Sequence, residues 1–231
     1  MTEDAIQFIK DNAIQGIVAC EDRVSEILSD IVEMIARDDH NLKWPQLLPS
    51  LREQANTSDP VILLRVFRTA APIFRKIRFM PRSDKLYTEI LYNMEHFGEV
   101  LHQKTEEATG FMDSSLSKDQ EKIVLEIVRN QMSCYKSLNS VEEWPEFFEE
   151  RFQSWKKIMF YFIDLTDTKN PSILMDVKRL SVEICNIVGC RFREDSEKEV
   201  RPLFEACWRL LPQIPANKEY SQAVQSLMNY V

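Results

Sequence analysis

Glycine is scarce in this chain, with only 4 residues among 231. Hairpin turns, dinucleotide-binding loops and phosphate-binding loops all need backbone positions at positive φ, which glycine usually supplies. No stretch of the sequence alternates apolar and polar residues for long enough to predict a sheet. The composition therefore favours helices and argues against folds that depend on many tight turns.

Long apolar runs and a surplus of basic residues are also missing. No run reaches the roughly 20 residues of a membrane span, and the charged opening MTEDAIQFIKDN is not a secretory signal. The formal net charge of −8 argues against nucleic acid as a partner, because phosphate binding needs surplus Lys and Arg. The 5 cysteines form no C-x-x-C pair, so we expect reduced thiols in an intracellular protein with no membrane insertion.

Apolar residues recur at helical spacing along almost the whole chain, and prolines beside Asp, Asn or Ser separate the stripes. We expect a loop at 109–119, the longest stretch without the pattern. The predicted helices span 3–19, 22–37, 44–56, 60–79, 83–108, 118–138, 143–166, 171–192, 195–212 and 217–230.

Short turns between helices of this length predict consecutive antiparallel pairs. A pair of about 40 to 47 residues is the unit of a HEAT-type solenoid. The expected fold class is all-α, a right-handed solenoid of about five HEAT-type helix pairs that forms a single segment over 1–231. Periodicity alone leaves a helical bundle open.

Two Trp-Pro pairs follow short acidic runs and begin new apolar stripes. Trp44 and Pro45 lie in ARDDHNLKWPQLLPSL, and Trp144 and Pro145 lie in SVEEWPEFFEERF. Proline costs no hydrogen bond in the first turn of a helix and pushes the preceding residue out of the α region. Each tryptophan is therefore expected at a bend, where its ring can cover the seam between two helices. An exposed aromatic anchor for a ligand is the alternative.

Motifs that carry catalysis or hold metals are few. Asp38 and Asp39 invite comparison with the D-D-x-x-D magnesium site of α-helical terpene synthases, but Leu42 stands at the third position. His96 and His102 are six residues apart, which is wrong for one helical face. The sequence contains no Walker A, G-x-S-x-G or G-x-G-x-x-G motif. We therefore expect no enzyme, cofactor or metal, and an α-helical magnesium-dependent enzyme that uses the Asp pair is the alternative.

Two charge clusters are candidates for binding other proteins. The segment from Arg65 to Lys85 is basic within an acidic chain, and a basic face can hold an acidic partner surface. Glutamates gather at the start of a later helix, where the helix dipole favours acids and where a basic ligand could bind. The alternatives are ion pairs with neighbouring helices and a solvated helix face. The candidate partner-binding residues are Arg68, Arg75, Lys76, Arg78, Arg82, Glu142, Glu143, Glu146, Glu149 and Glu150.

Several stretches, taken in order, resemble one known family. DDHNLKWPQLLPSL followed by VFRTAAPIFRKIRFMPRSDKLYTEI is similar to its successive patterns KWP-x-LL, LRTAHS-x-F-K-R-x-R and S-x-ELWTEI. Further on, SLNSVEEWPEFFEERFQSW is similar to LN-x-QDLPEFFED-x-x-x-x-W. The family is exportin-2, also called the cellular apoptosis susceptibility family, of the importin-β superfamily. The resemblance covers nearly the whole chain.

This resemblance has implications for organisation and function. It implies importin-β-like repeats over 1–108, a loop over 109–119 and central exportin-2-type repeats over 120–231. It also implies a nuclear transport receptor that binds the small GTPase Ran in its GTP form together with importin-α, exports importin-α and shuttles between nucleus and cytoplasm. The resemblance also allows contacts with the nuclear pore and residence at the nuclear envelope.

Two other functions remain, an importin-type karyopherin and a helical scaffold unrelated to transport. The family proteins are far longer than this chain. We therefore expect an N-terminal-to-central segment, either a fragment or a truncated protein.

Overall fold

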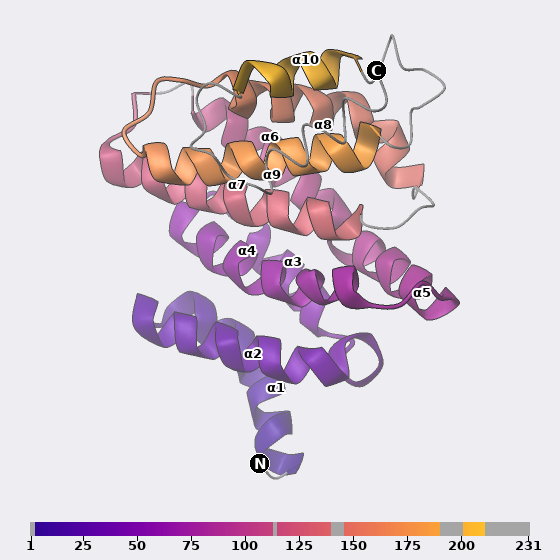
Figure 1. Ribbon diagram of the computed structural model, residues 1–231. Coiled ribbons are helices and arrows are strands. Elements are labelled where there is room, and N and C mark those ends of the chain that lie inside the picture. Colours follow the sequence, from indigo (N-terminus) through magenta and orange to yellow (C-terminus); the bar gives the residue numbers. More distant parts are fainter. Residues whose placement is uncertain (1–2, 113–114, 140–145, 190–200, 211–231) are drawn as a thin grey trace. The chain divides into compact units, whose positions relative to one another are not determined.

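The computed structural model describes residues 3–112, 115–139, 146–189 and 201–210, without the side chains of 38–42 and Gly189. These described residues form helices joined by short connections and contain no strand (Figure 1). The all-α prediction is therefore confirmed for this part of the chain. The chain divides into two compact units, Met1–Lys104 (unit 1) and Thr105–Val231 (unit 2).

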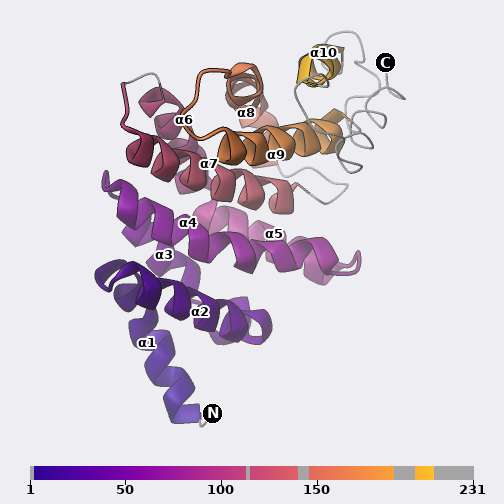
Figure 2. The same cartoon turned by 60° about the vertical axis from the view of Figure 1, so that its left-hand side comes forward.

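The helices of unit 1 pack as consecutive pairs, and one pair stacks on the next. Its elements are α1 (Glu3–Ala19), α2 (Asp22–Lys43), α3 (Leu47–Ala55), α4 (Pro60–Arg75), the 3-10 turn η1 (Lys76–Phe79), α5 (Asp84–Asn93), the π-helical turn η2 (Met94–Gly98) and the start of α6 (Glu99–Phe111). Consecutive helices pack as α1 with α2 and α3 with α4, while α1 also packs on α3 and α2 on α4 (Figure 2). Pairs that stack in this way are the arrangement of a helical repeat.

The core of unit 1 is aromatic. Phe97, on η2, is fully buried and makes edge-to-face contacts with Phe67 and Phe74, at centroid distances of 5.7 and 5.5 Å. Trp44 is only 4% exposed and lies where α2 ends, as the prediction of a seam-filling side chain requires. Trp144 lies outside the described residues.

Unit 2 contains the end of α6, then α7 (Lys118–Leu138), α8 (Glu146–Asp164), α9 (Pro171–Gly189) and α10 (Arg201–Leu210). Here α9 packs against both α7 and α8, and α10 packs against α8 and α9. The Trp155 ring on α8 stacks on Tyr135 of α7 at a centroid distance of 3.8 Å. Phe148 contacts the same Tyr135 edge-to-face at 4.9 Å, so aromatic side chains join α7 to α8.

The start of α7 is fixed from two sides. A capping box joins Ser117 and Gln120, in which each side chain accepts a hydrogen bond from the other residue's backbone N–H, at 3.2 and 2.9 Å. Glu121 accepts hydrogen bonds from the Lys169 backbone N–H at 2.9 Å and from the Thr168 hydroxyl. The turn before α9 is therefore held against the first turn of α7.

The division between the units falls inside α6, between Lys104 and Thr105. The sequence predicts the division at a loop over residues 109–119. In the structure, residues 109–111 of this segment are helical and residues 115–117 are not. The assignment of importin-β-like repeats to 1–108 and central exportin-2-type repeats to 120–231, within one segment over 1–231, stays a prediction. Among the described residues, no helix has the length and apolarity needed to cross a membrane.

Candidate partner-binding surfaces

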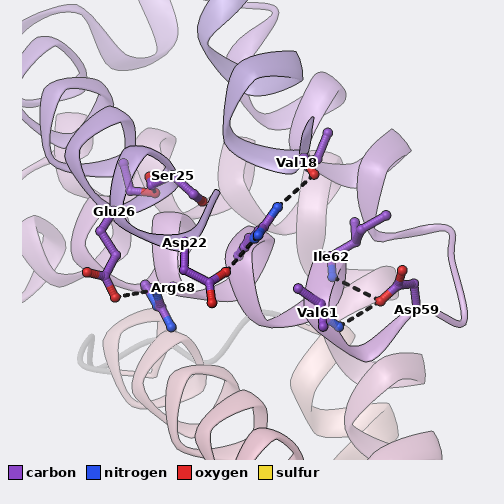
Figure 3. A network of polar contacts seen from close by, with 10 residues as sticks. Val18, Asp22, Ser25, Glu26, Asp59, Val61, Ile62 and Arg68 are labelled. Atoms are coloured by element: carbon purple, nitrogen blue, oxygen red, sulfur yellow. Dashed lines mark hydrogen bonds and ion pairs between the residues drawn. The ribbon is translucent and has the colours of Figure 1, made fainter. Parts of the chain in front are cut away.

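The position of the basic cluster is set by the cap of α4. The Asp59 carboxylate accepts hydrogen bonds from the backbone N–H groups of Val61 and Ile62, at 2.8 and 3.4 Å, and Pro60 occupies the first turn (Figure 3). The apolar face of the helix is buried in unit 1, through Leu63, Leu64, Val66, Phe67, Ala70, Ala71, Ile73 and Phe74. The arginines of α4 therefore lie on its remaining surface.

Arg65 and Arg68 bind acids on α2, within unit 1. Arg65 reaches the Asp22 carboxylate at 2.7 Å and the Val18 carbonyl at 2.9 Å. Arg68 reaches Glu26 at 2.7 Å (Figure 3). The hydrogen bond and the positive charge of Arg65 lower the pKa of Asp22 below its ordinary value. Arg68, one of the candidate residues, thus connects α4 to α2.

The other basic candidates surround the turn between α4 and α5. Arg75 and Arg82 are exposed, and Arg78 is half-buried. Lys76 donates a hydrogen bond to the Ala36 carbonyl at 3.3 Å. Arg75 makes no ion pair with any residue that the structure describes. These four cations therefore lie on η1 and on both sides of it.

Sequence reasoning missed one exposed residue at this turn. Phe79, the last residue of η1, is 81% exposed. A signal was present, because Ile77 is the last buried position of the stripe and Phe79 follows it by two residues, off the buried face. We define Arg75, Arg78, Phe79, Arg82 and Lys85 as the α4–α5 turn surface.

The acidic candidates that the structure describes lie at the start of α8, in unit 2. Glu146, Glu149 and Glu150 are exposed in its first turns, as the solvated-face alternative also requires. Arg151 pairs with Glu150 at 3.1 Å and lies over the Phe147 ring, 4.0 Å from its centroid. Glu142 and Glu143 lie outside the described residues.

Buried charged groups are a further feature that the sequence reasoning missed. Glu89 on α5 is 5% exposed, and burial raises the pKa of its carboxyl, although Lys76 and Lys85 act in the opposite direction. Lys178 on α9 is 2% exposed, and burial lowers the pKa of its ammonium group, against the effect of Asp164. Glu89 follows Leu86 and precedes Ile90, so its burial could have been inferred from its place within the apolar stripe.

We expect Glu89→Gln to stabilise the protein at neutral pH. Burial disfavours the ionised carboxyl, so an ionised Glu89 lowers the free energy of unfolding. This loss is absent at pH values below the pKa of Glu89 in the unfolded state, and it is complete above the raised pKa in the folded state. The contribution of Glu89 to stability should therefore fall as the pH rises from the lower of these pKa values to the higher one. The Glu89→Gln variant should not show this fall. Urea unfolding between pH 4 and pH 8 measures it, with the exposed Glu95→Gln as control. A variant that is less stable than the parent at neutral pH would contradict the explanation.

The carboxylates proposed for magnesium, Asp38 and Asp39, have side chains outside the described part. Among the described residues, no group of three His, Cys, Asp or Glu is placed to hold a metal ion.

Comparison with known proteins decides the family. Residues 73–231 match the model of the Cse1 family. The chain belongs to this family. The Cse1 match includes Arg75, Lys76, Arg78 and Arg82 together with the α8 glutamates, and it begins after Arg68.

Curated relatives of this Cse1 family member are named exportin-2. Identity is 23% over 233 residues with the protein from Danio rerio and 24% over 234 residues with that from Homo sapiens. Each alignment covers 96% of this chain and 24% of the relative. For the Drosophila melanogaster protein the identity is 24% over 219 residues, covering 88% of this chain and 22% of the relative. The chain thus spans about a quarter of the length of these relatives, and the resemblance inferred from its motifs is confirmed.

Among solved structures, a designed armadillo repeat protein, YIII(Dq)4CqI, is similar to the chain with a TM-score of 0.42 and 11% identity. The similarity covers 95% of this chain and 98% of the designed protein. The Cse1 family, through its exportin-2 members, is a family of nuclear transport receptors.

Proposed function

We propose that this chain acts as a segment of a nuclear transport receptor, binding the GTP form of Ran together with importin-α for export of importin-α from the nucleus. The observation that carries the proposal is the Cse1 match over residues 73–231. The exportin-2 relatives, aligned over nearly the whole chain, add to it. In this role the chain shuttles between nucleus and cytoplasm and catalyses no reaction.

The mechanism is coupled binding. Two ligands that favour the same conformation of a receptor each raise the affinity of the other, by the same factor. In the nucleus, Ran with GTP and importin-α would therefore bind together. Hydrolysis of GTP in the cytoplasm would remove one ligand, and the other would then dissociate.

Surface charge supplies the means of contact in this proposal. The basic candidates Arg75, Lys76, Arg78 and Arg82 suit an acidic partner surface, and the glutamates at the start of α8, with Glu142 and Glu143, suit a basic one. Complementary charges at an interface accelerate association and select the correct partner. Arg68 contributes less in this proposal, because it already binds Glu26 at 2.7 Å.

The triple variant Arg75→Glu, Arg78→Glu and Arg82→Glu is expected to weaken binding to Ran with GTP or to importin-α by roughly tenfold or more, because reversed charges repel an acidic surface. A pull-down with purified partners measures this loss.

The matched control reverses the same number of charges elsewhere in unit 1, at Arg23, Arg37 and Arg52, which are exposed. Binding should survive in the control. Equal binding by both triple variants would remove the basic cluster from the proposal. A lysate pull-down with the unmodified chain that recovers neither Ran nor importin-α would favour the scaffold alternative.

A further inference from the structure

Phe79 is more exposed than any other large apolar side chain in the described part of the chain, at 81%. It stands at the end of η1, directly before the connection to α5. A single exposed apolar residue is ordinary on a protein surface. The surroundings of Phe79 make it a candidate for binding, because the charged residues near it in sequence are mostly cationic.

The charge at this turn opposes that of the chain. Residues 75–85 contain five cationic residues and a single acid, Asp84, whereas the whole chain has a net charge of −8. On α2, Asp22 and Glu26 are bound by Arg65 and Arg68, which precede this segment on α4, and the charges of Lys76 and Lys85 act on the buried Glu89. Arg75 makes no ion pair with any described residue. Arg75 therefore offers positive charge to a partner, within a segment that is cationic as a whole.

The conformation of the turn is fixed by local contacts. The Ser83 hydroxyl donates to the Pro81 carbonyl at 3.1 Å and accepts from the Leu86 backbone N–H at 3.3 Å, which caps α5. On one side Ile77 is 1% exposed, and on the other Leu86 is 6% exposed, so both flanks are anchored in the core of unit 1. A surface held in one conformation loses little entropy when it binds a ligand.

We infer that the α4–α5 turn surface is a docking site for an acidic peptide segment that carries one bulky apolar side chain. Phe79 supplies the apolar contact, and the guanidinium groups of Arg75 and Arg82 hold the flanking carboxylates. The inference goes beyond the transport proposal, because it names a residue and a ligand chemistry that require neither Ran nor importin-α. A peptide is favoured over nucleic acid or an anionic membrane because the net charge of −8 repels extended polyanions, while a short segment meets only the local cations.

The test uses the full chain and a defined probe. A fluorescein-labelled peptide, Glu-Asp-Glu-Phe-Glu-Asp-Glu, is titrated with the protein at low and at physiological salt, and fluorescence anisotropy gives Kd. We expect binding that weakens as salt rises. Peptides with Ala in place of Phe, or with Lys in place of every acid, should bind at least tenfold more weakly.

Variants of the protein assign the binding to the turn. Phe79→Ala should weaken binding of the probe at least tenfold, and the double variant Arg75→Glu with Arg82→Glu should weaken it to the same extent. Phe79→Leu, which keeps an apolar side chain, should retain most of the affinity. The controls are Phe8→Ala, at a position 69% exposed on α1, and Arg23→Glu, at an exposed position near the start of α2, and neither should change Kd. Circular dichroism confirms that each variant is folded.

Three results would overturn the inference. The first is no binding of the probe by the folded, unmodified chain. The second is an equal loss of affinity for the probe in the Phe79→Ala and Phe8→Ala variants, or no loss of affinity in either. The third is displacement of the probe by a single-stranded oligonucleotide or by phosphatidylserine vesicles at lower concentration than by unlabelled peptide, which would assign the surface to a different class of ligand.

Discussion

Trp155→Ala is expected to lower the free energy of unfolding by about 3–5 kcal/mol. Trp155 is fully buried in unit 2 and stacks on Tyr135 at 3.8 Å, and that ring also contacts Phe148. Truncation removes the apolar contacts of the indole and leaves a cavity that helices packed around it fill only in part. Urea unfolding followed by circular dichroism measures the change, since this signal does not depend on the tryptophan that is removed.

The matched control is Trp208→Ala. Trp208 lies on α10 in the same unit but is 50% exposed, so its truncation should cost less than about 1 kcal/mol. Equal destabilisation by the two substitutions would contradict the described packing between α7 and α8.

Phe97→Ala is expected to have an effect of similar size in unit 1, about 3–5 kcal/mol. Phe97 is fully buried on the π-helical turn η2, and its ring contacts two others edge-to-face, Phe67 at 5.7 Å and Phe74 at 5.5 Å. Aromatic pairs of this geometry contribute beyond the area that they bury. Both partners lie on α4, so the substitution should loosen the packing of η2 against that helix.

Hydrogen exchange followed by mass spectrometry locates this effect. Amides of α4 and η2 should exchange faster in Phe97→Ala than in the parent, and urea unfolding should show the loss of stability. The exposed Phe8→Ala serves as control and should leave both unchanged. Unchanged exchange throughout α4 in the Phe97 variant would show that these rings do not hold the unit together.

Much of the secondary structure could be predicted from the sequence because it depends on local patterns. Apolar spacing and prolines beside Asp or Ser indicate where helices begin, as at Asp59 and Pro60, whose cap the structure contains. The burial of Trp44 at a bend follows from the geometry that Pro45 imposes. The π-helical turn Met94–Gly98 could not be foreseen, since the apolar residues Ile90, Met94, Phe97 and Leu101 keep the spacing of an ordinary α-helix across it.

The candidate surfaces were predicted less fully, because ion pairs join residues far apart in sequence. The sequence indicates that Arg68 lies in a basic segment, but only the packing of α2 against α4 brings Glu26 within 2.7 Å of it. Exposure of Phe79 similarly depends on where α4 tightens into η1. The family, by contrast, was accessible from ordered motifs such as KWPQLL, because these preserve side-chain identity as well as polarity.

The most direct test of the proposed transport role is isothermal titration of the unmodified chain with Ran in its two nucleotide states, with and without importin-α. We expect the GTP form to bind, the GDP form to bind at least tenfold more weakly, and importin-α to tighten binding of the GTP form. Absence of binding by either form, or equal affinity for both, would contradict the account.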